Sequence, residues 1–451
     1  MEKKKIIMII GLIVYLIIIF VTEIFYRKPL FDRSVVYEES IKQSGFLHYF
    51  YFFWSYIFIY SMLVIGVLIV LLFYPYNIFL TLATIIVTLF FIMCFLKSVY
   101  VNSRPYWEIY NEKINNLDFS TKPTECDGEF GNPSGHSLLA TAFLNLWYLF
   151  IYSDFLKKFG KTCQFFSKII GLIIVIVCIL LVMYSRIHRQ VHAFNQIIFG
   201  CLLGLAVFFA FCCILEFATI EPETFFNFLY KFKYFIIPFL LVLFVISVIL
   251  GYTRHNEYED EYRDVLEKYC DFGDKKSFGK STAYHSGIIF VLIGGYFGIL
   301  FLVYKINKYH KKEKEMFYHW NEGPKLTTFK IFIFAFILPA IPVVIIFVIP
   351  YKYFALKFVF EVIIYFYYGF IGLGLCFYYV CVKFKNLKTN NNDNNNNNVN
   401  INNDINNSNE NNINSNNNNE NDNIANINNY VNNNNNNNNN NSNNEIIVNV
   451  R

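Results

Sequence analysis

The sequence is dominated by apolar runs that are long enough to cross a lipid bilayer. A membrane-spanning helix needs about 20 consecutive, mostly apolar residues. Only 16% of the residues are charged, whereas a typical soluble domain has about a quarter. We therefore expect an all-α, polytopic membrane protein with about ten transmembrane helices. The ten windows lie at 6–25, 53–74, 77–97, 136–153, 168–184, 193–215, 234–252, 286–304, 329–349 and 358–382.

Composition and hydropathy divide the chain into four parts. Residues 1–50 hold an N-terminal span, which we expect to be retained, and a non-cytosolic loop. Residues 51–216 form the expected helical-bundle core, and residues 217–383 add further transmembrane helices. Residues 384–451 are almost entirely asparagine with a few acidic residues. Such a segment cannot bury enough apolar surface to fold, so we expect a disordered cytosolic tail.

Basic residues set the expected orientation in the membrane. Ten spans place Lys3–Lys5, the loop at Lys157–Lys168 and the loop at Lys305–Lys314 on one side. The positive-inside rule makes this side cytosolic. The acidic segment Glu257–Asp264 falls on the opposite side. Both termini are then expected in the cytosol.

The cysteine and charge patterns argue against two kinds of site. The ten cysteines show no CxxC spacing and no Cys/His cluster, so we expect neither a metal nor a cofactor. The net charge of +5 is modest and lies in short loops, which is typical of membrane topology and not of nucleic-acid binding. Cys126 and Cys270 are the only cysteines in expected non-cytosolic loops. Two thiols there allow a disulfide without requiring one.

Three polar blocks lie at the non-cytosolic ends of spans and can converge on one site. Lys97, Arg104 and Arg186 supply three cations for a phosphate group, and the planar fork of arginine binds two oxygens at once. The helix that starts after Ser134 and Gly135 offers backbone N–H groups to the same anion. The blocks are Lys97-Ser-Val-Tyr-Val-Asn-Ser-Arg104-Pro105, Pro133-Ser134-Gly135-His136, and Ser185-Arg186 followed by five residues and His192.

The two histidines of these blocks can divide the chemistry of phosphate ester hydrolysis. Gln196 follows His192 by one helical turn, so its amide oxygen can accept the ring N–H and fix the tautomer. His136 lies at a helix start and lacks such a partner. We expect His192 to attack phosphorus, and His136 to protonate the leaving alcohol and then activate water.

The ordered pattern K-x6-RP, PSGH and SR-x5-H resembles the signature of the type-2 phosphatidic acid phosphatase and glucose-6-phosphatase superfamily. The resemblance covers roughly residues 50–215. It implies a metal-independent phosphoric monoester hydrolase that works through a phosphohistidine. It also implies a nucleophile at His192, a general acid/base at His136, an orienting residue at Gln196, and substrate-binding residues at Lys97, Arg104, Ser134, Gly135 and Arg186.

The substrate is less constrained than the reaction. Most members of the superfamily carry Asp four residues after the nucleophilic histidine, where this chain has Gln196. The glucose-6-phosphatase branch is similar to this chain in its Gln and in the run Arg104-Pro105-Tyr106-Trp107. We therefore favour a glucose-6-phosphatase-like enzyme of the endoplasmic reticulum with a lumenal site.

Two alternatives stay open. One is a lipid phosphate phosphatase that acts on phosphatidate or a sphingoid-base phosphate. The other, from a different class, is a polytopic transporter without enzymatic activity. A transporter is expected to show paired broken helices and charged groups near the middle of the membrane. In this chain the charged residues lie mostly at one face instead. The oligomeric state is not predicted.

Overall fold

The computed structural model describes residues 2–41, 45–73, 76–115, 123, 125–149, 161–220, 230–253, 259–270, 286–309 and 354–372. All of them lie in the unit Met1–Lys385. This described part of the chain is helical and contains no strand. The span expected at 329–349 and the asparagine-rich segment 384–451 lie outside the described residues.

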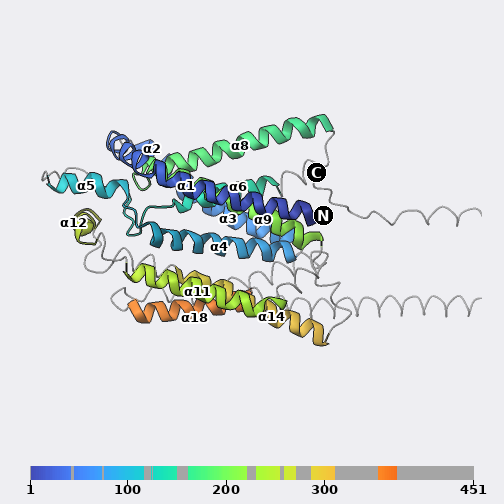
Figure 1. The fold of residues 1–451 in the computed structure, drawn as a ribbon. Coiled ribbons are helices and arrows are strands. Elements are labelled where there is room, and N and C mark those ends of the chain that lie inside the picture. The colour runs from blue at the N-terminus through green and yellow to red at the C-terminus, as the bar shows by residue number, and fades with distance from the viewer. Residues whose placement is uncertain are drawn as a thin grey trace, which may run out of the picture. The chain divides into compact units, whose positions relative to one another are not determined.

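Figure 1 shows the described helices. In chain order they are α1 (Glu2–Glu39), α2 (Gly45–Phe52), the π-helix η1 (Phe53–Phe58), α3 (Ile59–Phe73), α4 (Tyr76–Tyr100), α5 (Pro105–Asn115), α6 (Gly135–Trp147), α8 (Lys161–His188), α9 (Phe194–Ile220), α11 (Lys233–Thr253), α12 (Glu259–Cys270), the 3₁₀ helix η4 (Ser286–Ile288), α14 (Ile289–Tyr309) and α18 (Phe354–Phe370).

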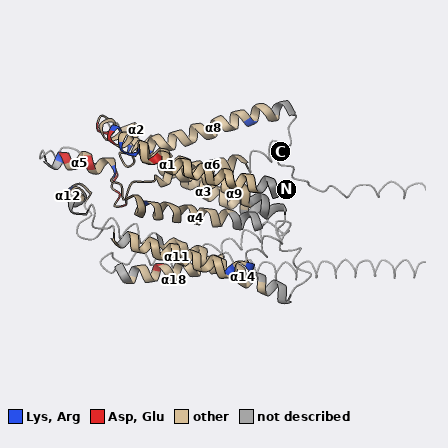
Figure 2. Cartoon of the chain, viewed as in Figure 1, with Lys and Arg blue, Asp and Glu red and all other residues tan. Residues whose placement is uncertain are grey.

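Among the described residues, six helical stretches are long and apolar enough to cross a membrane, and two shorter apolar helices accompany them. This finding supports a membrane protein, while the count of ten spans stays a prediction. The six are Ile6–Glu39, Gly45–Val70, Leu82–Tyr100, Gln164–His188, Phe194–Ile214 and Lys233–Leu250; the shorter ones are Ile289–Phe301 and Phe358–Phe370. Figure 2 shows long uncharged stretches along these helices, with many charged residues near α2 and α5.

Helix α1 is longer than its apolar window. We expected a span that ends near Phe25, but the helix continues to Glu39 and includes Pro29. It is held along its length by α9: the Tyr15 hydroxyl donates a hydrogen bond to the Leu202 carbonyl at 3.1 Å. Hydropathy thus located the apolar part of this helix but not its end, because packing keeps the charged continuation helical.

The main apolar core lies between α1, α4, α6 and α9. Its buried side chains include Ile19, Leu89, Leu138, Phe199 and Phe211. Two glycines of α9 let this helix approach α6 closely. A Cβ atom at Gly200 would lie 2.6 Å from the Ser134 carbonyl oxygen, and one at Gly204 would lie 2.6 Å from that of Leu138. The tight contact places α9 directly against the start of α6, where the Pro133–His136 block lies.

A second cluster, of mainly aromatic residues, joins α5 to α12. Trp107 is fully buried, and its ring lies 5.6 Å from that of Tyr262 between centroids. Phe130, from the loop before α6, packs in the same cluster. A disulfide between Cys126 and Cys270 bonds this loop to the end of α12. The pair that the sequence left open is therefore bonded in this structure.

This disulfide predicts a defined labelling pattern. In the non-reduced protein, a thiol-reactive maleimide should leave Cys126 and Cys270 unmodified, because bonded sulfurs have no thiolate to react. Peptide mass spectrometry should recover the two cysteines in one cross-linked species, which separates on reduction. The Cys126→Ser variant is the control, since it should free Cys270 for labelling. Modification of both cysteines before reduction would contradict the pairing.

Candidate active site

The first block contributes two buried cations where α4 ends and α5 begins. Lys97, in the last turn of α4, forms an ion pair with Glu129. Arg104 is fully buried, and its Nη2 lies 2.6 Å from the Asp127 carboxylate. Arg104 also donates hydrogen bonds to the backbone carbonyls of Glu129 at 2.6 Å and Val191 at 3.0 Å. The guanidinium thus links the loop before α6 to the loop before α9.

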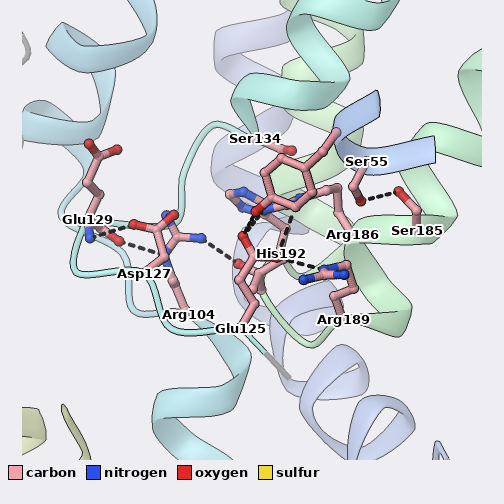
Figure 3. A network of polar contacts seen from close by, with 12 residues as sticks. Ser55, Arg104, Glu125, Asp127, Glu129, Ser134, Ser185, Arg186, Arg189 and His192 are labelled. Carbon is pink, nitrogen blue, oxygen red and sulfur yellow. Dashed lines mark hydrogen bonds and ion pairs between the residues drawn. The ribbon is translucent and has the colours of Figure 1, made fainter. Parts of the chain in front are cut away.

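The third block contributes two more cations at the end of α8. Arg186 is buried and donates two hydrogen bonds to the Glu125 carboxylate, at 3.2 and 3.3 Å. Arg189, one turn later, contacts the same carboxylate through Nε at 2.7 Å. The hydroxyl of Tyr56 also donates to Glu125. Figure 3 shows how Arg186 and Arg189 converge on this acidic side chain.

The four cations are therefore each paired with an acidic residue of one short loop. Glu125, Asp127 and Glu129 alternate along the chain, and alternate residues of an extended segment point to the same side. Their carboxylate oxygens contact the same four cations that a ligand with several anionic oxygens would contact. A phosphate group matches this arrangement, because its oxygens accept charge-assisted hydrogen bonds from the same donors.

The second block lies beside these cations at the start of α6. Ser134 is the N-cap residue, and its backbone N–H donates to the Gln196 carbonyl at 3.0 Å. The first N–H groups of a helix have no acceptor within the helix, so this end can bind an anion. A Cβ atom at Gly135 would lie 2.1 Å from the Met93 sulfur, so a larger residue there would have to displace the Met93 side chain.

His192 is held by acceptors on only one side of its ring. Its Nδ1 lies 2.9 Å from the Gly131 carbonyl oxygen and 3.3 Å from the amide oxygen of Gln196. Both partners can only accept, so Nδ1 carries the proton and Nε2 keeps its lone pair. Burial lowers the pKa of His192 well below its usual value, and Arg104, Arg186 and Lys97 lower it further. The imidazole is therefore neutral at pH 7, as a nucleophile must be.

The partner that sequence reasoning gave His192 is only part of its environment. We expected Gln196 alone to orient the ring, but the Gly131 carbonyl is closer. Gln196 is itself fixed, because its Oε1 accepts the Ala193 N–H at 3.2 Å and its Nε2 donates to the Ser103 carbonyl at 2.8 Å. A backbone carbonyl has no sequence signature, so this contact could not be read from the residues.

His136 begins α6 with a ring that packs edge-on against two tyrosines. Its ring centroid lies 5.4 Å from that of Tyr56 and 6.1 Å from that of Tyr60. Its Nε2 is buried and makes no hydrogen bond to the described residues. A buried nitrogen of this kind is available to exchange a proton with a ligand. His188, which the signature leaves free, packs instead against Tyr51 at 4.3 Å between centroids.

The structure brings all the predicted site residues into one region and adds four that sequence reasoning missed. The additions are Glu125, Asp127, Glu129 and Arg189. The alternating acidic pattern directly before the Pro133–His136 block was a usable signal for the first three. Arg189 carried none, because it occupies a position that the three-block signature leaves open.

The geometry brings four buried cations and two histidines together among helices of which several are long and apolar enough to cross a membrane. Residues 78–220 match the family model of the PAP2 superfamily. The matched segment contains all three blocks. The match suggests phosphatase activity on a phosphorylated small molecule or lipid. Comparisons with curated proteins and with solved structures found no match to either.

The Glu125 carboxylate predicts a pH dependence of stability. Burial alone would raise its pKa, but Arg186, the Tyr56 hydroxyl and Arg189 outweigh burial and lower the pKa to about 2. An unfolded glutamate titrates near 4.3. The stabilisation is thus fully present above pH ~4.3 and is lost as the pH falls through ~2; at most it is about 3 kcal/mol.

The measurement is the thermal unfolding midpoint of the detergent-solubilised protein between pH 6 and pH 3. Glu125→Gln should lower the midpoint at pH 6 and flatten its decline toward pH 3. Glu39→Gln, a change of an exposed carboxylate at the end of α1, serves as the matched control and should keep the wild-type slope. An unchanged slope in Glu125→Gln would show that the pair with Arg186 and Arg189 does not stabilise the fold.

Proposed function

We propose that this chain hydrolyses a phosphate monoester through a phosphohistidine at His192. The observation that carries the proposal is the geometry of this side chain: its Nδ1 lies 2.9 Å from the Gly131 carbonyl oxygen, beside the buried cations Arg104, Arg186 and Lys97. The same cations can neutralise a phosphate dianion and the charge that builds on it in the transition state. The match to the PAP2 superfamily supports the reaction class.

In the first step, the Nε2 lone pair of His192 attacks phosphorus. A bond forms between Nε2 and phosphorus, and the bond from phosphorus to the ester oxygen breaks with its electron pair going to that oxygen. The bound phosphate dianion favours the protonated form of His136, which gives its proton to this oxygen, so a neutral alcohol leaves. The Gly131 carbonyl stabilises the cationic ring because it accepts the Nδ1–H.

In the second step, His136 acts as a base. Its neutral ring takes a proton from water while the water oxygen attacks phosphorus, and the bond to His192 Nε2 breaks. Inorganic phosphate and the starting enzyme result. Lys97, Arg104 and Arg186 hold the phosphoryl oxygens through both steps, while Ser134 and Gly135 place the N-terminus of α6 beside them.

The preferred substrate class is a sugar phosphate, as in a glucose-6-phosphatase-like enzyme. Support comes from the buried residues that follow Arg104. The Tyr106 hydroxyl bonds to both the carbonyl and the N–H of Asp127, at 2.8 and 3.0 Å. Trp107 packs beside Phe130. The residues shared with that branch thus hold the acidic loop in place. We place the enzyme in the endoplasmic reticulum with its site in the lumen and both termini in the cytosol.

A substrate panel tests the proposal directly. The purified protein should release phosphate from glucose 6-phosphate faster than from phosphatidate or a sphingoid-base phosphate. Metal independence is part of the prediction, so activity should persist in a chelator and vanadate should inhibit it. Faster turnover of the lipids would redirect the proposal to a lipid phosphate phosphatase. No phosphate release from any substrate, with transport of one of them by reconstituted protein, would favour the transporter.

The two histidines should respond differently to substitution. His192→Ala should abolish both turnover and the covalent intermediate. His136→Ala should keep more activity on an aryl phosphate than on an alkyl phosphate, because a good leaving group needs little protonation. Rapid quench with radiolabelled substrate measures the intermediate, which should be acid-labile and map to His192. A label on His136, or the same leaving-group dependence in both variants, would overturn this division of roles.

A further inference from the structure

Helix α1 contacts the site loops at three points, although it lies outside the segment 78–220 that matches the family model. Asn132 Nδ2 donates to the Glu23 carboxylate at 3.0 Å. The Phe194 N–H donates to the Ser34 hydroxyl at 2.6 Å. Gln190 Nε2 donates to the Glu38 carbonyl at 2.8 Å. These contacts reach the loop before α6 and both sides of His192.

Glu23 is an unusual residue for a membrane-spanning helix. Its side chain is fully buried, and Arg27 pairs with both of its oxygens, at 2.7 and 2.5 Å. Ionisable groups within a span are expensive and usually mark a functional site. The pair with Arg27 neutralises the charge within α1. Arg27 lies 4.5 Å from the ring centroid of Tyr100 in α4, and the hydrogen bond from Asn132 links Glu23 to the loop before α6.

Asn132 lies between two functional positions. The residue before it, Gly131, supplies the carbonyl that fixes Nδ1 of His192. The block that follows it begins α6. Gly131 has little freedom of its own: its N–H bonds to the Asn102 carbonyl at 2.8 Å, and a Cβ atom there would lie 2.5 Å from the Gln196 amide. Holding Asn132 therefore holds the carbonyl that sets the tautomer and tilt of the His192 ring.

Ser34 acts on the other side of the nucleophile. Phe194 is the first residue of α9, and its N–H has no acceptor within that helix. The fully buried Ser34 hydroxyl supplies one, so it works as an N-cap contributed by another helix. Because His192 stands two residues before Phe194 in the chain, this contact fixes the backbone that carries the imidazole.

We infer that α1 is a functional part of the catalytic unit, with Glu23 and Ser34 as positioning residues for His192. The inference rests on the proposed function, since it concerns the step in which His192 attacks phosphorus. Neither side chain touches any of the four buried cations in the described contacts. Their removal should therefore slow the formation of the phosphoenzyme without weakening the binding of an anion by those cations.

The test compares Glu23→Leu and Ser34→Ala with wild type and with Thr22→Val. Thr22 is the control because it is exposed on the same helix and bonds only within α1 in the described contacts. Rapid quench gives the single-turnover rate of phosphohistidine formation, and competitive inhibition gives the affinity for inorganic phosphate, which the cations bind without a bond to His192. Misplacement of a reacting group by about 1 Å can cost about 100-fold in rate. We expect a loss of about 10- to 100-fold in the rate of phosphorylation, with the affinity for inorganic phosphate within about twofold of wild type.

A double-mutant cycle between Glu23→Leu and Asn132→Ala measures how strongly the two side chains depend on each other in their effect on the phosphorylation rate. Positioning through Asn132 predicts that the double variant is no slower than the slower single variant. Normal phosphorylation rates in folded Glu23→Leu and Ser34→Ala proteins would overturn the inference. A parallel fall in the affinity for inorganic phosphate, or independent, multiplicative effects in the cycle, would overturn it as well. If wild type forms no phosphohistidine, the proposed function fails first and the inference fails with it.

Discussion

Burial of positive charge is the constraint on which the rest of this structure depends. Lys97, Arg104, Arg186 and Arg189 are all buried, in a protein whose helices are mostly apolar. An unpaired ion in such a setting costs several kcal/mol. Three carboxylates on one loop form ion pairs with these cations and so offset the cost of burying them. Under the proposed function, an anionic substrate would replace the loop carboxylates as the partner of these cations.

The loop is in turn held from outside the motifs. The Tyr106 hydroxyl donates a hydrogen bond to the Asp127 carbonyl and accepts one from the Asp127 N–H. A disulfide between Cys126 and Cys270 bonds the loop to α12. Gln196 shows why an amide suits this site. Its Nε2 donates to the Ser103 carbonyl, a contact that a carboxylate would make repulsive. The departure from the usual aspartate therefore fits the local hydrogen bonding, while the Gly131 carbonyl takes over much of the orientation of His192.

Sequence reasoning located most of the described helices for a physical reason, while the roles of the reacting groups stay a prediction. Long apolar runs leave helices as the main way to satisfy backbone groups in a bilayer, so α4, α8, α9 and α11 overlap their expected windows. The three motif blocks converge because they lie at corresponding ends of neighbouring helices. The end of α1 was wrong, since tertiary packing and not hydropathy decides where a charged helical segment stops.

Other features had no signal that a single sequence could carry. The Gly131 carbonyl is a backbone group, and the contact from Glu23 to Asn132 joins residues 109 positions apart. Arg189 lies within the stretch that the signature treats as free. The acidic loop is the exception, because the alternating acidic residues Glu125, Asp127 and Glu129 directly precede the Pro133–His136 block in the sequence. Counting the charges needed to neutralise the predicted cations would have pointed to them.

The hydrogen bond between the Gly131 carbonyl and His192 has one further chemical consequence. A phosphorylated imidazole exists as two isomers, with phosphorus on Nδ1 or on Nε2. The carbonyl at 2.9 Å occupies the Nδ1 side of the ring and leaves only Nε2 open to an electrophile. If His192 carries a phosphoryl group as proposed, the backbone of a loop without reacting groups sets its position: the product would be the tele isomer, distinguishable from the pros isomer by its phosphorus resonance.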